Sequence, residues 1–222
     1  MLAVRQVIKS YGARRVLDKV SFDVARGERV ALTGPSGSGK TTLLNCLGGV
    51  DRPDGGAIIL QGEDVHRLSS DALARVRRSR VGTIFQFFHL LPTLTAAENI
   101  ELPLQLVGVE QAQRRRGVEA ILDRVGLSAR AGALPAQLSG GEQQRIAIAR
   151  ALVHRPAVVL ADEPTGNLDS ANGASILALL RELTDERGVA LVLVTHSEEA
   201  AAICHRRIRL RDGRVVSADE SE

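Results

Sequence analysis

The alternation of apolar and polar positions predicts strands near both ends of the chain and in its middle. Residues 2–9 and 16–24 read as strands, the second with Val20, Phe22 and Val24 at alternate positions, and they predict an antiparallel pair. Short apolar runs predict further strands at 30–32, 57–61, 81–85, 157–161 and 189–194. In the tail, 208–216, an Asp-Gly pair separates two short runs and predicts a hairpin.

Apolar residues at helical spacing predict helices between these strands. Ser69 or Ser70 is expected to cap one helix, and Thr95 to Glu98 to form the capping box of the next, which Pro103 kinks or ends. Gly126 is expected to follow the helix that carries Val118 to Val125. Ser139 and Glu142 predict a second capping box, and a later helix is expected to be capped by Ser170 and to end at Gly188. No strand is predicted from about residue 87 to 153. The pattern therefore predicts an α/β fold with an inserted helical lobe.

The composition is consistent with this fold and also indicates where in the cell the protein is expected. The chain has 222 residues and 44% hydrophobic content, which suits one α/β domain with a small inserted subdomain. No apolar run approaches the roughly 18 residues of a membrane span, and no signal-peptide pattern follows Met1, so we expect a cytoplasmic protein. Cys46 and Cys204 lack the spacing of a metal site or a disulfide framework and are expected to be buried and reduced.

The charge pattern argues against a nucleic-acid surface. The formal net charge is +3, and arginines cluster at 75–80 and 114–116. Acidic residues are interspersed elsewhere and no aromatic residues accompany the arginines, so solvated helix faces explain these clusters better than phosphate contacts do.

A glycine-rich segment, GPSGSGKTT, joins the strand at 30–32 to a helix-like run that starts at Leu43. Its spacing fits a phosphate-binding loop, in which backbone N–H groups surround the β-phosphate and Lys40 reaches the β- and γ-phosphates. Glycines let the backbone approach the anion, the helix points its positive end at it, and the hydroxyl of Thr41 is available to Mg²⁺. The chain is therefore predicted to bind a nucleoside triphosphate through Gly34, Pro35, Ser36, Gly37, Ser38, Gly39, Lys40, Thr41 and Thr42.

Carboxylates and a histidine follow two of the predicted buried strands. Asp162 and Glu163 end the strand at 157–161, where one carboxylate suits a water-mediated Mg²⁺ contact and the other can polarise an attacking water. Adjacent strand residues point to opposite sides, so the two need not share a role. His196 follows the strand at 189–194, at the edge where ligands bind parallel sheets, and is either structural or functional.

Two glycines open the helix after Ser139, in the sequence LSGGE. A capping box explains Ser139 and Glu142, but glycines in the first turn cost about 1 kcal/mol each relative to alanine. We infer that something approaches this helix end closely, and the helix dipole favours an anion.

The aromatic residues leave alternatives open. Tyr11, the single tyrosine, stands at a strand end before the phosphate loop and is either a core residue or a platform for an adenine ring. Three of the four phenylalanines lie at 85–88. They form either a local core beneath the helical lobe or a groove for the apolar helix of a partner.

Together these segments resemble the ATP-binding-cassette (ABC) ATPases over essentially the whole chain. Gly34 to Thr41 matches the Walker A loop, Val158 to Asp162 the Walker B strand, and Leu138 to Glu142 the signature, with LSGGE where many members have LSGGQ. The other matches are Gln86 in the Q-loop, Asn167 to Asp169 in the D-loop, His196 as the switch histidine and Tyr11 at the adenine-stacking position, with Val16 also in the nucleotide site.

The resemblance implies a P-loop NTPase core with a mixed parallel sheet, an N-terminal antiparallel β subdomain and an inserted α-helical subdomain. Within the single domain of residues 1–222, residues 1–86 and 154–222 are expected to form the core and the β subdomain. Residues from about 87 to 153 are expected to form the helical subdomain with the signature.

The resemblance also implies a mechanism. ATP is expected between the Walker A face of one subunit and the signature helix of the other in a head-to-tail homodimer, where Ser139, Gly140, Gly141 and Glu142 act in trans. Glu163 is the expected catalytic base, assisted by His196 and Gln86. Mg²⁺ is expected at Thr41, Gln86 and Asp162.

The wording of ADEPTGNLDS and FHLLPTLTAAENIELPL looks most like bacterial ATPase subunits that serve lipoprotein release, macrolide efflux and cell division. This implies a separate membrane permease, docked near Phe87, Phe88, Leu90 and Leu91, and a place on the cytoplasmic face of the bacterial inner membrane. The alternative is a soluble ABC protein acting on nucleic acid or translation. The DNA-repair kind needs a long coiled coil and the translation kind usually has two cassettes, and neither is present; a guanine-reading N-K-x-D segment is absent too.

Overall fold

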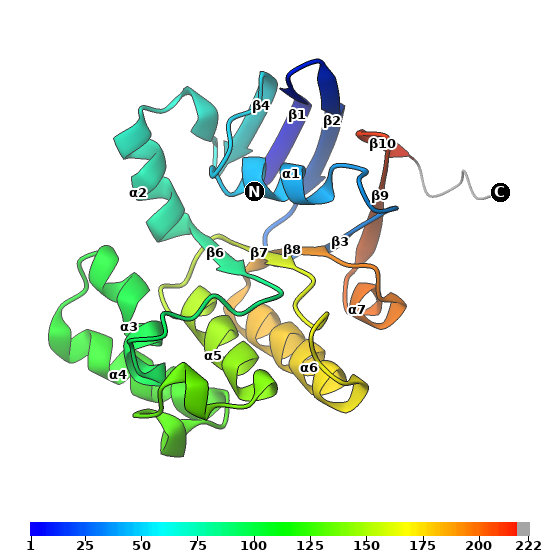
Figure 1. Cartoon of the computed structure of the whole chain (residues 1–222). Coiled ribbons are helices and arrows are strands. Elements are labelled where there is room, and N and C mark those ends of the chain that lie inside the picture. The colour runs from blue at the N-terminus through cyan, green and yellow to red at the C-terminus, as the bar shows by residue number, and fades with distance from the viewer. Residues whose placement is uncertain (217–222) are drawn as a thin grey trace.

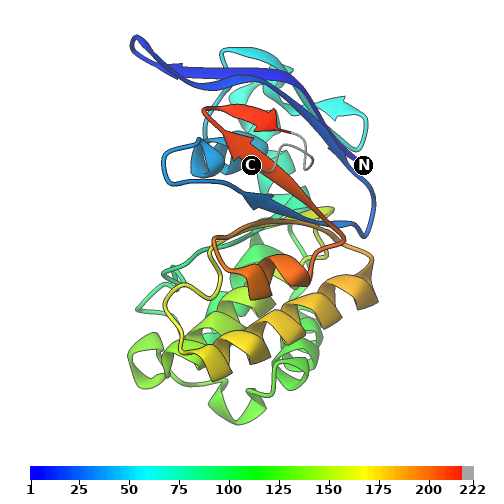
Figure 2. The same cartoon turned by 90° about the vertical axis from the view of Figure 1, so that its right-hand side faces the viewer.

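Two sheets lie one above the other in the computed structural model, which describes residues 1–216 (Figure 1). The smaller sheet has the strand order β2-β1-β4-β5, and the larger has the order β10-β9-β3-β8-β7-β6. Figure 2 shows the smaller sheet above, the larger one near the middle and a layer of helices below. The predicted α/β fold with a mixed parallel sheet and an antiparallel β subdomain is confirmed.

The smaller sheet is antiparallel and covers the phosphate-loop helix from above. Its strands are β1 (Leu2–Tyr11), β2 (Arg14–Val24), β4 (Gly55–Leu60) and β5 (Glu63–Asp64). Val4 pairs with Phe22 of β2 and with Ile58 of β4. All three are buried, as the alternating pattern predicts for a sheet with one face on the core.

The larger sheet is parallel except at one edge. Its strands are β3 (Arg29–Thr33), β6 (Val81–Ile84), β7 (Val158–Asp162), β8 (Ala190–Val194), β9 (Arg206–Arg211) and β10 (Arg214–Val216). On β8, Val192 packs into the apolar layer between the sheets, whereas Leu191 and Leu193 pack on the helical side. Both faces are therefore buried, which explains the unbroken apolar run. β9 and β10 form the predicted hairpin, with Asp212 and Gly213 at positive φ.

Seven α-helices are present in residues 1–216. They are α1 (Lys40–Leu47), α2 (Ser70–Arg80), α3 (Ala96–Leu106), α4 (Gln111–Arg124), α5 (Gly140–Leu152), α6 (Ser170–Arg187) and α7 (Glu198–Ala202), with short 3-10 turns at Val65–Arg67, Ser128–Arg130 and Pro135–Gln137. α1 lies between the sheets, and α5, α6 and α7 lie on the opposite face of the larger sheet (Figure 2). Residues 87–153 contain helices and no strand, as predicted.

Most predicted helix ends are confirmed. Ser69 caps α2, Thr95 forms a capping box with Glu98, and Gly188 ends α6 in the left-handed conformation. Gly126 also has positive φ, just after α4. These ends were predictable because a cap depends on residues within one turn of each other.

Two helix ends differ from the prediction. α6 is capped by Asp169, whose side chain accepts from the Asn172 N–H, and Ser170 is the first helical residue instead of the cap. Of the two outcomes predicted for Pro103, a kink or an end, the end is wrong, because α3 continues to Leu106. A proline removes one hydrogen bond to the residue four positions earlier, and here burial of Ile100 and Leu104 on the same helix keeps the chain helical.

The structure bears on the predictions of buried, reduced cysteines and of a chain without a membrane span. Cys46 and Cys204 are free thiols, as predicted, but only Cys46 is fully buried, and the expectation of burial is wrong for Cys204. Burial raises the pKa of the Cys46 thiol to about 12, so it stays protonated. Within residues 1–216, no helix combines the length and the apolar character needed to cross a bilayer.

Candidate nucleotide-binding site

The turn between β3 and α1 is shaped by backbone crowding. Gly34 has φ +139°, and a Cβ there would lie 2.0 Å from the carbonyl oxygen of Leu210 on β9. Gly39 has φ +103°, and its Cβ would lie 2.8 Å from the carbonyl oxygen of Val16. Neighbouring strands of the same chain thus require glycine here, independently of any anion.

Lys40 opens α1 and is folded back over this turn. Its Nζ donates hydrogen bonds of 2.8 Å to the carbonyl oxygens of Gly34 and Pro35. Burial lowers the pKa of the Lys40 ammonium, and the carboxylates of Glu163 and Asp162 oppose that shift. The lysine therefore adds positive charge to the phosphate loop, with carboxylates nearby.

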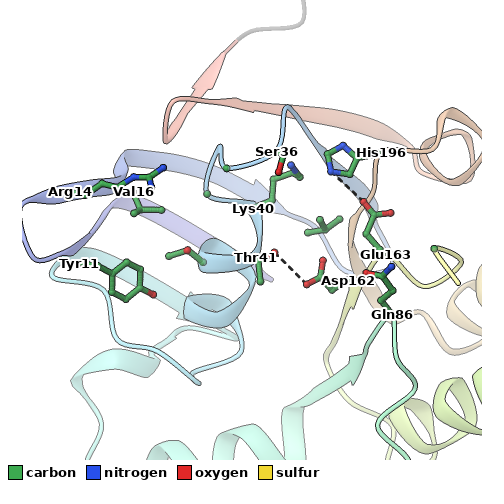
Figure 3. Close-up of a pocket in the computed structure, with 15 residues that line it drawn as sticks. Tyr11, Arg14, Val16, Ser36, Lys40, Thr41, Gln86, Asp162, Glu163 and His196 are labelled. Atoms are coloured by element: carbon green, nitrogen blue, oxygen red, sulfur yellow. Dashed lines mark hydrogen bonds and ion pairs between the residues drawn. The ribbon is translucent and has the colours of Figure 1, made fainter.

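Thr41 and Asp162 face each other across the gap between α1 and β7 (Figure 3). The Thr41 Oγ1 donates to the Asp162 Oδ2 over 3.5 Å. Burial raises the pKa of the Asp162 carboxyl, opposed by the Thr41 hydroxyl and by Lys40. A hydroxyl beside a carboxylate that forms no ion pair within residues 1–216 fits a hard cation such as Mg²⁺, which prefers oxygen ligands.

Gln86 lies beside this pair and is bonded to the loop that follows β7. Its Nε2 donates to the Asn167 Oδ1 over 3.3 Å, and the Asn167 Nδ2 donates to the Gln86 carbonyl oxygen over 2.9 Å. Within residues 1–216, no three His, Cys, Asp or Glu side chains gather in a metal-binding cluster. A cation at this site would therefore depend on hydroxyl and amide oxygens as well as on Asp162.

Glu163 follows β7 in the left-handed conformation, with φ +46°. Its Oε2 accepts a hydrogen bond of 3.3 Å from the Thr195 hydroxyl, and its Oε1 lies 3.7 Å from the His196 Nε2 (Figure 3). That Oε1 is buried and makes no hydrogen bond with the described residues. Burial raises the pKa of the Glu163 carboxyl, opposed by His196 and by the Thr195 hydroxyl. A carboxylate held in this way is suited to accept a proton from a water.

These side chains line one cavity of about 590 Å³ at the carboxyl ends of the parallel strands. Figure 3 shows Tyr11 at one end and Glu163 with His196 at the other. The lining residues are Tyr11, Arg14, Val16, Ser36, Gly37, Gly39, Lys40, Thr41, Thr42, Gln86, Asp162, Glu163, Gly166, Val194 and His196.

Three residues of the predicted phosphate loop lie outside this lining. Gly34 and Pro35 line a neighbouring hollow that also contains His196. Ser38 is 3% exposed, and its hydroxyl has no hydrogen-bond partner among the described residues. Buried polar groups normally have a hydrogen-bond partner, so this hydroxyl fits a loop that binds a ligand able to supply that hydrogen bond.

Tyr11 is 51% exposed, so the reading of it as a core residue is wrong. Its hydroxyl donates a 2.5 Å hydrogen bond to the Asp51 Oδ2, and the Lys9 Nζ lies 5.1 Å from the ring centroid. The ring is thus held at the mouth of the cavity with its body accessible, and stacking on a base stays a prediction.

The LSGGE segment lies outside the cavity, at the start of α5. Ser139 is exposed, and its Oγ accepts a hydrogen bond of 3.3 Å from the Glu142 N–H. A hydroxyl that accepts from this amide still has its own proton to donate. Gly141 is buried, and a Cβ there would lie 3.2 Å from the Asn172 Oδ1, so close packing against α6 within one chain also favours a small residue here.

Three residues that shape the site were not predicted to have a role in it. Thr195 holds Glu163, Asp51 holds Tyr11, and Arg14 lines the cavity. Thr195 is next to the predicted site residue His196, and Arg14 lies just before the strand predicted at 16–24. Their nearness in the sequence to these predicted features could have pointed to them. Asp51 lies 40 positions from Tyr11, and no local pattern connects them.

Comparisons with known proteins agree with this geometry. The family model described as "ABC transporter" matches residues 17–166. The chain is 46% identical to the lipoprotein-releasing system ATP-binding protein LolD of Shewanella denitrificans, over 100% of this chain and 96% of that protein. It is 52% identical to the macrolide export ATP-binding/permease protein MacB of Burkholderia pseudomallei, over 90% of this chain and 31% of that protein.

Solved structures point the same way. The ATP-binding cassette MJ0796, solved as a dimer in a post-hydrolysis state with ADP and phosphate, has a TM-score of 0.88 and 40% identity, covering 98% of this chain and 97% of that one. A cbiO1 structure from Clostridium perfringens has a TM-score of 0.89 and 27% identity, covering 97% of this chain and 86% of that one. None of these relatives supports the alternative of an ATPase acting on nucleic acid.

Proposed function

This chain belongs to the ABC transporter family as an ATP-hydrolysing subunit, and on that premise we propose that two copies associate head to tail around ATP. The observation that carries the proposal is the separation of two sets of groups. The cavity holds the phosphate loop, both carboxylates and His196, whereas Ser139 is exposed elsewhere at a helix start. A second copy would supply its Ser139, Gly140, Gly141 and Glu142 to the open side of the cavity.

In this site the triphosphate is bound by the phosphate loop and Lys40, with Tyr11 and Val16 on the base side. Glu163 accepts the proton of the attacking water, and its Oε1 has no hydrogen bond to residues 1–216 that must first be broken. His196, 3.7 Å away, orients Glu163 and the γ-phosphate. Ser139 of the second copy donates its hydroxyl proton to a phosphate oxygen, which adds to charge neutralisation.

Thr41, Gln86 and Asp162 are the residues that would hold Mg²⁺, as the oxygen donors of Thr41 and Asp162 support. When bound, the ion neutralises phosphate charge. The contribution of the chain is to orient these donors, and the Asn167 amide does so for Gln86.

We further propose a membrane permease partner, since relatives include a lipoprotein-releasing and a macrolide export protein. The proposed contact is the segment of Phe87, Phe88, Leu90 and Leu91, at the edge of a helical lobe that we place at about residues 87–153. Phe87 is 68% exposed and Leu91 is 43% exposed, whereas Leu90 packs partly against the core. With this partner the chain would work at the cytoplasmic face of the bacterial inner membrane.

Turnover by the purified chain tests the two-copy site. We expect phosphate release per mole of protein to increase with protein concentration, because two copies complete each site, and we expect Glu163→Gln to abolish it. Constant activity per mole from nanomolar to micromolar protein, with the chain monomeric in ATP, would contradict the proposal.

A further inference from the structure

The segment after Gln86 has an unfavourable backbone. Phe88 and His89 have φ of +59° and +47°, a conformation that residues other than glycine seldom adopt. The His89 N–H donates to the Phe87 carbonyl oxygen over 2.5 Å, and the rings of Phe85 and His89 lie 4.4 Å apart. Two consecutive left-handed residues persist only where surrounding contacts hold them.

Arg150 of α5 supplies such contacts. Its Nη1 donates to the His89 carbonyl oxygen over 2.5 Å, and its Nη2 donates to the Phe88 carbonyl oxygen over 2.9 Å. One planar guanidinium thus binds two successive carbonyl groups of a segment about 60 positions away. Because the fork is rigid, these bonds fix the orientation of both peptide groups.

The positive charge of Arg150 is not neutralised by an acidic side chain within residues 1–216. Its hydrogen bonds go to carbonyl oxygens, no carboxylate of the described residues forms an ion pair with it, and burial lowers the pKa of its guanidinium. A partly buried cation without a counter-ion is costly unless hydrogen bonds satisfy it. The carbonyl groups of the left-handed segment meet that need, so the arginine and the loop stabilise each other.

The same segment also lies close to the other end of α5. A Cβ placed on Gly140 would lie 3.7 Å from the Phe88 Cζ, which puts the Phe88 ring at the first turn of the helix. The Phe88 ring therefore lies close to the turn that begins with Ser139, while the Phe88 carbonyl oxygen is held by Arg150 near the end of α5. Gln86, two residues earlier, is bonded to Asn167 beside the carboxylates.

We propose that Arg150 is a positioning residue that fixes the loop after Gln86 to helix α5, so that the Gln86 side of one site and the Ser139 turn of the other move as one body. This role rests on the proposed two-copy site. It would let nucleotide binding at Gln86 place Ser139 for the partner copy. Arg150 itself touches neither nucleotide nor the reacting atoms.

Arg150→Lys tests this role, because lysine keeps the charge and the helix propensity but lacks the rigid fork. Arg145→Lys is the matched control, since Arg145 lies on the same helix and donates to the Ser175 Oγ over 2.9 Å. We expect faster amide hydrogen exchange over residues 86–91 in Arg150→Lys alone. We also expect its kcat to fall about tenfold, the worth of one charge-assisted hydrogen bond, with KM for ATP nearly unchanged.

If exchange over residues 86–91 matches wild type, or if kcat and KM change as they do in Arg145→Lys, the proposal is wrong. A lower melting temperature without the kcat change shows a purely structural arginine and also overturns it. Should Arg150→Lys not fold, Arg150→Gln is measured in the same way. The exchange experiment needs no turnover, so its result separates failure of this role from failure of the two-copy site.

Discussion

The Thr195 hydroxyl donates a 3.3 Å hydrogen bond to one carboxylate oxygen of Glu163, while the other oxygen is buried and has no hydrogen-bond partner among the described residues. Thr195 is 1% exposed at the end of β8, and the Ser197 N–H donates to its Oγ1 over 3.0 Å. The threonine is thus rigidly placed. It orients the proposed base and leaves the second oxygen for a water.

This arrangement predicts how the kcat for ATP hydrolysis falls on the acid side of its pH profile. Burial raises the pKa of Glu163 above its ordinary 4.5, and protonation removes the base, so turnover should fall with decreasing pH earlier than for an exposed glutamate. The Thr195 hydrogen bond favours the charged form and limits that shift. Thr195→Val should therefore move the acid limb of the kcat profile to higher pH. A limb that stays in place or moves to lower pH would show that Thr195 does not act on the base.

The same raised pKa predicts an effect on stability. The folded protein binds the Glu163 proton more tightly than the unfolded chain, so this group favours folding at low pH and opposes it once the pH rises above 4.5. Glu163→Gln should raise the melting temperature of the nucleotide-free protein at pH 7. This gain in melting temperature should disappear when the pH is below the ordinary pKa of a glutamate, because the protonated Glu163 and the glutamine of the variant are then both neutral. Equal melting temperatures at pH 7 would argue against a costly buried charge.

Tyr11 gives a prediction about nucleotide affinity. Tyr11→Ala should weaken binding by about 1 to 3 kcal/mol, as for bases stacked on aromatic rings, and ATP and GTP should be affected alike. Tyr11→Phe is the control, because it removes the hydrogen bond to Asp51 and keeps the ring. Titration with a fluorescent nucleotide measures both variants. Unchanged affinity in folded Tyr11→Ala would remove Tyr11 from the site.

The exposed residues after Gln86 give a prediction about the permease. Replacing Phe87 and Leu91 by serine should leave folding and the ATP-dependent dimer intact and abolish co-purification with the permease. Val50→Ser is the matched control, since Val50 is 66% exposed outside this segment. Phe88→Ala is less suitable, because the Phe88 side chain is half-buried and its ring lies close to Gly140. Retained co-purification of the double variant would place the contact elsewhere.

Local patterns predicted much of this structure, and the reason is physical. The caps at Ser69 and Thr95 and the left-handed end at Gly188 depend on neighbours within one turn, so their spacing determines them. The glycine-rich turn between β3 and α1 was predictable for the same reason. Asp169 and Ser170 are adjacent residues of nearly equal capping preference, and the sequence could not decide between them.

Contacts between distant segments could not be predicted from one sequence. Thr195 with Glu163, Tyr11 with Asp51, and Arg150 with His89 each join residues that are at least 32 positions apart. Their pairing depends on how strands and helices pack, which periodicity does not encode. The reason for glycine at Gly34 belongs here too, since the crowding group is the Leu210 carbonyl on β9.

The central claim, a site shared between two copies, is tested most directly by the mass of Glu163→Gln in solution, measured by light scattering with and without ATP. We expect the 23.7 kDa chain to be monomeric without nucleotide and to double its mass with ATP. Ser139→Asp added to this variant keeps a capping side chain but places a negative charge where a phosphate is predicted, and Ser139→Asn is its neutral control.

With ATP, Glu163→Gln/Ser139→Asp should stay at 23.7 kDa while the Asn control still dimerises, and both should retain nucleotide binding. A Glu163→Gln variant that remains monomeric in ATP, or an Asp variant that dimerises as readily as its Asn control, would contradict the shared site.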